Sequence, residues 1–160
     1  MRQKIDDAEQ QASPEKISEY RDYTIPFFYA PESPPSVMNE HQKTGQQGEA
    51  IAKFYLIEKG YIVEAVGYRY KRVELDLIVK NETDCLIFVE VKTRKGLKWG
   101  HPSGAVSITK EKNMSKAASA YMREVGHDWE VRFDIISILL HKNGTHTLEH
   151  IEDAFFPGLF

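Results

Sequence analysis

Apolar residues recur at helical spacing in two stretches of the chain. The first runs from Ala50 to Ile57, with Thr44 as a candidate N-cap and Gly60 as a residue suited to end a helix. The second covers Ile108 to Val125. We therefore predict two helices, separated by a block of strands.

Between the helices, the pattern is typical of strands over residues 61–66, 73–79 and 85–91. The third of these is nearly all apolar, which favours a central place in a sheet. Tyr68 to Arg72 is predicted to form a polar, basic turn, and Asn81 to Asp84 the turn of a hairpin.

After the second helix, residues 130–140 again follow a strand pattern. Asn143-Gly144 is a strong signal for a tight hairpin turn, so residues 145–151 are predicted to return as an edge strand. The predicted order is α-β-β-β-α-β-β, an α/β fold.

The first 37 residues differ in composition from the remainder. They are acidic and then rich in proline, with no period. We predict that residues 1–37 form a disordered or loosely docked extension and residues 38–160 one domain. Two alternatives stay open. The aromatic residues near Phe27 can form a short arm that docks on the domain, and Met38 can be the true start of the protein.

Composition narrows the class of protein. The 160 residues suit one domain, and 41% hydrophobic residues suffice for a core. No stretch approaches the roughly 20 apolar residues of a membrane-spanning helix. The single cysteine, Cys85, excludes an internal disulfide and a zinc cluster. We expect a cytoplasmic protein without a membrane partner.

Charge is unevenly distributed along the chain. The net charge of −3 is carried by residues 1–37, whereas residues 69–116 hold 11 Lys/Arg against six Asp/Glu. A basic stretch of this kind can follow a phosphate backbone, although many solvated surfaces share it.

Two acidic residues on predicted strands are candidates for a metal site. If residues 73–79 and 85–91 form a hairpin, Asp76 and Glu90 can converge near one end of the sheet. Two neighbouring carboxylates repel each other, and a bound cation removes that cost. Oxygen ligands favour Mg²⁺, for which Mn²⁺ can substitute.

Lys92 lies two residues beyond Glu90, on the same face of the strand and roughly 7 Å away. Its ammonium can hold an attacking water or stabilise developing negative charge. A lysine whose pKa is lowered can instead be neutral and take the proton of the water. A metal beside it would polarise a phosphoryl oxygen. Metal-dependent phosphodiester hydrolysis is one chemistry that such a set of residues can perform.

The spacing Asp76–x13–Glu90–x–Lys92 resembles the core pattern of the PD-(D/E)xK nuclease superfamily. Taken with other segments in the same order, the chain resembles the YraN-like family over about residues 38–157. That family is largely uncharacterised and is itself similar to archaeal Holliday-junction resolvases. The matching segments are Gly45–Glu49, Glu74–Ile78, Phe88–Arg94, Lys110, Arg132–Ile136 and His150–Phe155.

The resemblance implies a restriction-endonuclease-like core, a central mixed β-sheet flanked by helices. It implies that Glu49 joins Asp76 and Glu90 as a third acid at the metal. It also implies nucleic-acid contacts from basic residues, which are Arg69, Arg94 and Lys110. Family members often carry glycine at positions 72 and 73 and an acid at position 104, so this chain departs at Arg72, Val73 and Gly104.

Structural roles are open alternatives for several of these residues. A Glu–x–Lys on a strand is commonly a cross-strand ion pair, and Glu49 can pair with Lys53. Glu74 suits an exposed strand position, and Asp134 suits a structural acid that caps a loop or pairs with Arg132. The remaining residues with an open role are Cys85 as a core residue, Trp99 as a base-stacking or anchoring residue, and His101 as a substrate contact or a solvated side chain.

The first hypothesis is a metal-dependent endonuclease acting on DNA, with a branched or structured form implied by the resolvase resemblance. A homodimer would match the two-fold symmetry of such a junction. The alternative is a nucleic-acid-binding module that does not cut. A third interpretation is a protein-interaction domain that uses residues 25–37 as a docking arm.

Overall fold

A computed structural model describes residues 39–96 and 107–156. The predictions for residues 1–37, for Met38, and for Trp99, His101 and Gly104 fall outside these ranges. Within them, no helix is long and apolar enough to cross a membrane.

The two predicted helices are present. Helix α1 spans Glu40–Glu58 and helix α2 spans Ile108–Val125. The N-cap of α1 is Asn39, whose side chain and that of Gln42 form a capping box. The prediction of Thr44 as N-cap was therefore wrong: Thr44 lies inside the helix, and its hydroxyl donates to the carbonyl of Glu40.

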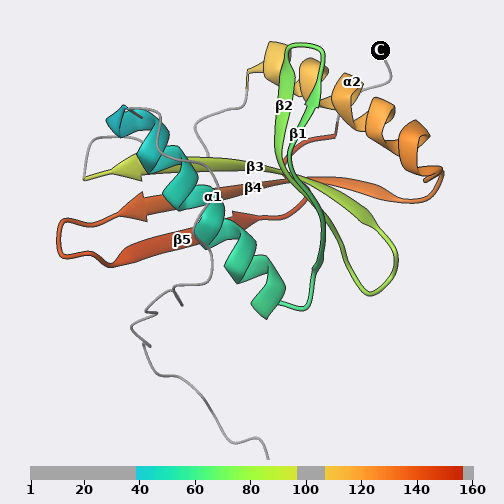
Figure 1. The fold of residues 1–160 in the computed structure, drawn as a ribbon. Helices are drawn as coiled ribbons and strands as arrows, with labels where there is room; N and C mark the ends of the chain where they lie inside the picture. Colours follow the sequence, from blue (N-terminus) through green and yellow to red (C-terminus); the bar gives the residue numbers. More distant parts are fainter. Residues whose placement is uncertain (1–38, 97–106, 157–160) are drawn as a thin grey trace, which may run out of the picture. The chain divides into compact units, whose positions relative to one another are not determined.

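The five strands form a single mixed sheet in the order β1-β2-β3-β4-β5 (Figure 1). Pairing is antiparallel except between β3 and β4, which run parallel. The central position of β3 and the order α-β-β-β-α-β-β confirm the prediction. The strands are β1 (Ile62–Tyr70), β2 (Val73–Lys80), β3 (Leu86–Lys95), β4 (Val131–Leu140) and β5 (His146–Ile151).

The predicted turn at Tyr68 to Arg72 is shorter than expected. Strand β1 continues to Tyr70, and only Lys71 and Arg72 separate it from β2. Polar composition suggested a longer turn, but the ring of Tyr68 packs edge-on against Tyr121 of α2, with centroids 4.9 Å apart. This contact with a distant helix keeps the segment extended.

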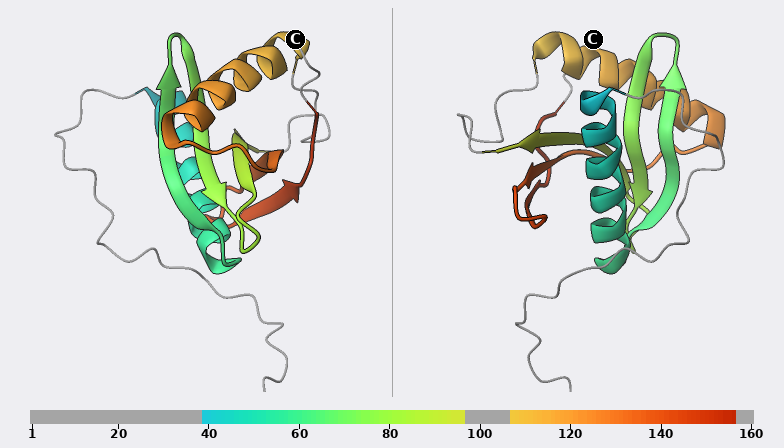
Figure 2. Two further views of the ribbon diagram at one scale, coloured as in Figure 1. Left: turned by 90° about the vertical axis from the view of Figure 1, so that its right-hand side faces the viewer. Right: turned by 60° about the vertical axis from the view of Figure 1, so that its left-hand side comes forward.

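Each face of the sheet carries its own apolar core and its own helix. One core contains Ala52 and Leu56 of α1, and the other contains Met114 and Tyr121 of α2. Figure 2 shows the sheet between the two helices. Cys85 belongs to the α1 core, as expected for a small buried residue.

Strand β2 separates from β3 part of the way along its length. Its pairing with β3 covers only Leu77 to Lys80, whereas its pairing with β1 continues to Val73. The β1–β2 hairpin thus leaves the sheet and rises beside α2 (Figure 1). The hairpin also twists, because Leu77 packs in the α1 core while Leu75 packs in the α2 core.

Candidate active site

Asp76 and Glu90 face each other where β2 and β3 separate. The last paired residues are Leu77 and Val89, so the same antiparallel register sets Asp76 opposite Glu90, on one face of the strand pair. The hairpin prediction therefore brought the two acids together correctly. The sequence did not indicate that the backbone ladder ends between them.

The carboxylate of Asp76, and not a backbone carbonyl of β2, accepts the next hydrogen bond from β3. Its Oδ2 accepts a 2.7 Å hydrogen bond from the amide of Val91 in β3. Burial and the neighbouring Glu90 raise the pKa of Asp76 to about 7, against the lowering effects of that amide and of Lys110. Asp76 is thus held close to β3 in an environment that disfavours its charge.

Glu90 is buried, with only 8% of its surface exposed. The ammonium of Lys110, in the first turn of α2, lies 3.0 Å from Glu90 Oε2. The same oxygen is inaccessible and has no hydrogen bond of good geometry, so the contact is an electrostatic pair that leaves its acceptor capacity unused. The sequence placed Lys110 only by family resemblance, and its pairing with Glu90 was not predicted.

Lys92 and Arg94 follow Glu90 along β3 at alternate positions, and so share its face of the strand. Lys92 lies opposite Ser137 of β4 and Arg94 opposite Leu139. Lys92 is half-buried and Arg94 is exposed. Within the described ranges Lys92 forms no ion pair.

Helix α1 approaches β3 closely beside these residues. A Cβ added to Gly48 would lie only 1.6 Å from Thr93 Oγ1, so glycine alone permits this contact. Thr93 Oγ1 is buried and has no hydrogen-bond partner among the described residues. The next residue along α1, Glu49, is half-buried.

Glu49 lies near the acids without joining them in a compact cluster. Burial and the charge of Glu74 raise its pKa, and its own charge helps to raise the pKa of Asp76. Over residues 39–96 and 107–156, however, no three His, Cys, Asp or Glu side chains gather closely enough to hold a metal ion. The described arrangement is therefore a pair of carboxylates with a third acid nearby.

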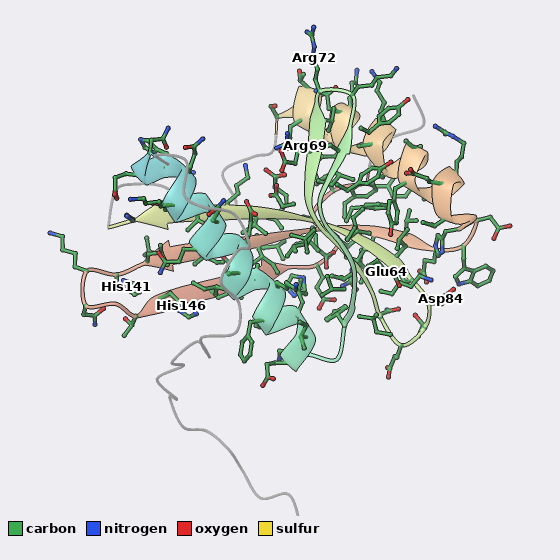
Figure 3. All side chains as sticks on the ribbon, viewed as in Figure 1. Glu64, Arg69, Arg72, Asp84, His141 and His146 are labelled. Atoms are coloured by element: carbon green, nitrogen blue, oxygen red, sulfur yellow. The ribbon has the colours of Figure 1, made fainter. Side chains whose placement is uncertain are left out.

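Arg69 lies on the β1–β2 hairpin, opposite Glu74 of β2. It forms a 2.9 Å ion pair with Glu74, and both side chains are largely exposed. This agrees with the expectation of an exposed Glu74. Figure 3 shows Arg69 along the hairpin and Arg72 at its tip.

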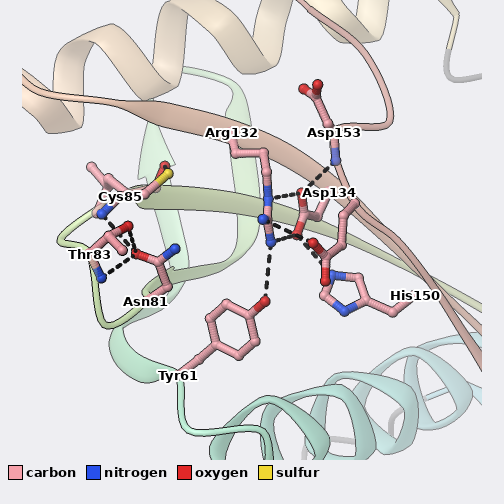
Figure 4. Close-up of polar contacts among 10 residues, drawn as sticks. Tyr61, Asn81, Thr83, Cys85, Arg132, Asp134, His150 and Asp153 are labelled. Atoms are coloured by element: carbon pink, nitrogen blue, oxygen red, sulfur yellow. Dashed lines mark hydrogen bonds and ion pairs between the residues drawn. The ribbon is translucent and has the colours of Figure 1, made fainter.

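A second polar cluster lies on the opposite face of the sheet, around Asp134 of β4 (Figure 4). Its carboxylate is fully buried and accepts hydrogen bonds from Arg132, His150 and the amide of Asp153. Although burial raises its pKa, the bonds from His150 and Arg132 hold the pKa of Asp134 below its ordinary value. Asp134 is the structural acid that was expected, because it pairs with Arg132 and holds the backbone after β5.

Known proteins similar to this chain include relatives that match most of its length. A protein of Phocaeicola vulgatus is 39% identical over 123 residues, which cover 77% of this chain and all of that protein. A protein of Bacteroides thetaiotaomicron is 41% identical with the same coverage. One from Pelobacter propionicus is 41% identical over 127 residues, 78% of this chain and 91% of that protein.

Among solved structures, SfsA of Pyrococcus furiosus in complex with Ca²⁺ aligns with 70% of this chain and 63% of its own, at 13% identity and a TM-score of 0.32. That similarity is too distant to bear on the chemistry of this chain.

The family comparison covers both acids and the strands that carry them. Residues 48–138 match the model of the uncharacterised protein family UPF0102, a range that includes Glu49, Asp76, Glu90 and Lys110. The relatives named above are themselves UPF0102 proteins. The match confirms the resemblance to the YraN-like family, and the chain belongs to the uncharacterised protein family UPF0102.

Proposed function

We propose that this protein is a metal-dependent endonuclease that hydrolyses phosphodiester bonds in DNA. The observation that carries the proposal is the facing pair Asp76 and Glu90, at the point where β2 separates from β3. Two acids on apolar strands are costly unless a cation binds them, and Lys92 on the same face supplies the third member of the nuclease pattern.

The residues fit a hard divalent cation. The buried Oε2 of Glu90 has unused acceptor capacity, and the raised pKa of Asp76 shows that its charge lacks full compensation. Carboxylate oxygens suit Mg²⁺ or Mn²⁺. Asp76 and Glu90 would hold the metal, with Glu49 as the third acid that the family resemblance implies. Bound there, the metal would polarise a phosphoryl oxygen and acidify a water.

The basic residues would bind and orient the substrate. Lys92, half-buried and two residues beyond Glu90 on β3, would hold the attacking water and stabilise the developing negative charge. Arg94, exposed near the end of β3, would contact a phosphate, as would Lys110 at the start of α2. A branched DNA is the form that the resolvase resemblance supports, and a homodimer would match its two-fold symmetry.

Metal binding by calorimetry tests the proposal. Mg²⁺ and Mn²⁺ are titrated at pH 8 into the wild type and into Asp76→Ala/Glu90→Ala, with Glu58→Ala/Glu82→Ala as a control that loses two exposed acids. We expect saturable binding by the wild type and the control, and none by the site variant. Branched, single-stranded and duplex DNA are then compared as substrates for cleavage.

A non-cutting nucleic-acid-binding module is the second candidate, and one observation favours it. Lys110 already neutralises Glu90 from 3.0 Å away, as a fixed internal ion pair would. Wild-type protein that binds DNA but no metal, even with DNA present, would establish this second function and exclude the nuclease mechanism.

A further inference from the structure

In the ion pair between Lys110 and Glu90, the lysine is much more exposed to solvent than the glutamate. The Glu90 side chain is 11% exposed, whereas that of Lys110 is 38% exposed. Glu90 is fixed in the central strand of the sheet, while Lys110 reaches it on a flexible four-carbon stem from the first turn of α2. If the pair separates, the lysine is therefore the partner that moves.

The ammonium lies where it competes with a metal. It contacts Oε2 of Glu90, the buried oxygen that has no hydrogen bond. It also lies close enough to Asp76 to act against the rise in that group's pKa. A divalent cation held by Glu90 and Asp76 and an ammonium 3.0 Å from the same oxygen would repel each other strongly, so the two compete for one place.

We propose that Lys110 is a built-in counter-ion, which neutralises Glu90 in the metal-free protein and must be displaced for a divalent cation to bind. This inference rests on the proposed function, because it concerns the same two acids. It adds that metal affinity is set partly by a lysine of α2, and that metal binding moves the Lys110 ammonium away from Glu90.

The first test measures affinity without DNA. Mn²⁺ is titrated by calorimetry into the wild type, Lys110→Met and Lys116→Met, the last removing an exposed lysine of the same helix. Lys110→Met is expected to bind Mn²⁺ about tenfold more tightly than the wild type, and Lys116→Met to bind as the wild type does. Equal or weaker binding by Lys110→Met, or equal tightening by Lys116→Met, would overturn the proposal.

The second test separates displacement from a simple loss of nearby charge. An amine-specific reagent labels the wild type, and mass spectrometry follows Lys110 and Lys116 individually. Saturating Mn²⁺ is expected to raise the labelling rate of Lys110 severalfold and to leave that of Lys116 unchanged. A Lys110 rate that does not respond to Mn²⁺ shows that the ion pair stays intact, and refutes displacement.

The outcomes also distinguish this inference from the proposed function. If neither the wild type nor Lys110→Met binds Mn²⁺, the counter-ion role and the proposed nuclease function are both refuted. If the wild type binds Mn²⁺ and Lys110→Met binds it no more tightly, only the counter-ion role is refuted. Binding by Lys110→Met alone supports displacement in its strongest form. Should Lys110→Met unfold without metal, recovery of its fold on adding Mn²⁺ supports the proposal, and failure to recover it counts against it.

Discussion

At the residue scale, the closest contact beside the candidate site depends on a glycine. Gly48 lets α1 lie against Thr93 of β3, and it precedes Glu49 directly. Thr93 in turn follows Lys92. Because Gly48 has no Cβ, α1 can pack closely on β3. This packing sets the distance between Glu49 on the helix and Glu90 and Lys92 on the strand.

Gly48→Ala is expected to lower the free energy of unfolding by about 2 kcal/mol, because the added Cβ overlaps Thr93 in a packed contact. Gly45→Ala is the matched control in the same helix, where an added Cβ meets nothing within 4 Å. It should stabilise by about 0.5–1 kcal/mol through helix propensity. Urea unfolding measures both, and a Gly48→Ala variant as stable as the control would contradict this packing.

At the scale of elements, the separation of β2 from β3 creates the site. A continuous ladder would satisfy the amide of Val91 with a backbone carbonyl, but here the Asp76 side chain accepts its hydrogen bond. The carboxylate is thereby held beside Glu90 in partial burial, which raises its pKa to about 7. The strand geometry thus makes Asp76 both a structural and a titrating group.

The raised pKa of Asp76 makes the stability of the metal-free protein depend on pH. Because it lies above the ordinary value of 3.8, the folded protein keeps a proton that the unfolded chain releases. Stability from this group is therefore present at low pH and lost as pH rises from about 4 to about 7. Asp76→Asn removes the charge and keeps an acceptor for Val91.

We expect the stability advantage of Asp76→Asn over the wild type to grow by about 2 kcal/mol between pH 5 and pH 8. Urea unfolding in the presence of a chelator measures it, with Asp128→Asn, an exposed acid, as control. Stability curves of the wild type and Asp76→Asn that run parallel over this range would show that Asp76 titrates as it does in the unfolded chain.

At the scale of the whole domain, several Arg and Lys side chains lie along the β1–β2 hairpin and the adjacent end of α2. A groove there is lined by three cations and one acid, with two tyrosines and an alanine: Arg69, Lys71, Arg123, Glu124, Tyr68, Tyr70 and Ala120. Lys71 adopts a left-handed conformation, with φ of 56°, at a turn where glycine would be unstrained. Arg72 places a further positive charge at the hairpin tip (Figure 3).

If the protein binds DNA as proposed, Arg72→Glu is expected to weaken that binding and to reduce the slope of log affinity against log salt by about 1, because the variant would lose one phosphate contact. Lys142→Glu, an exposed change in the turn between β4 and β5, should leave the slope unchanged. Fluorescence anisotropy over a salt series measures both. Identical slopes for the two variants would mean that the hairpin tip does not contact the DNA backbone.

The sequence by itself determined the helices, the strands and the pairing of Asp76 with Glu90, because periodicity reports which side chains share a face within one element. It missed the N-cap at Asn39 and the continuation of β1 through Tyr68, where a capping box and contact with α2 outweighed the local pattern.

Only the tertiary structure decided that β2 leaves β3 at Asp76, that Lys110 reaches Glu90, and that Gly48 packs on Thr93. The physical reason is that these contacts join elements distant in the chain. Their geometry depends on strand twist and helix packing, which no local pattern of residues records.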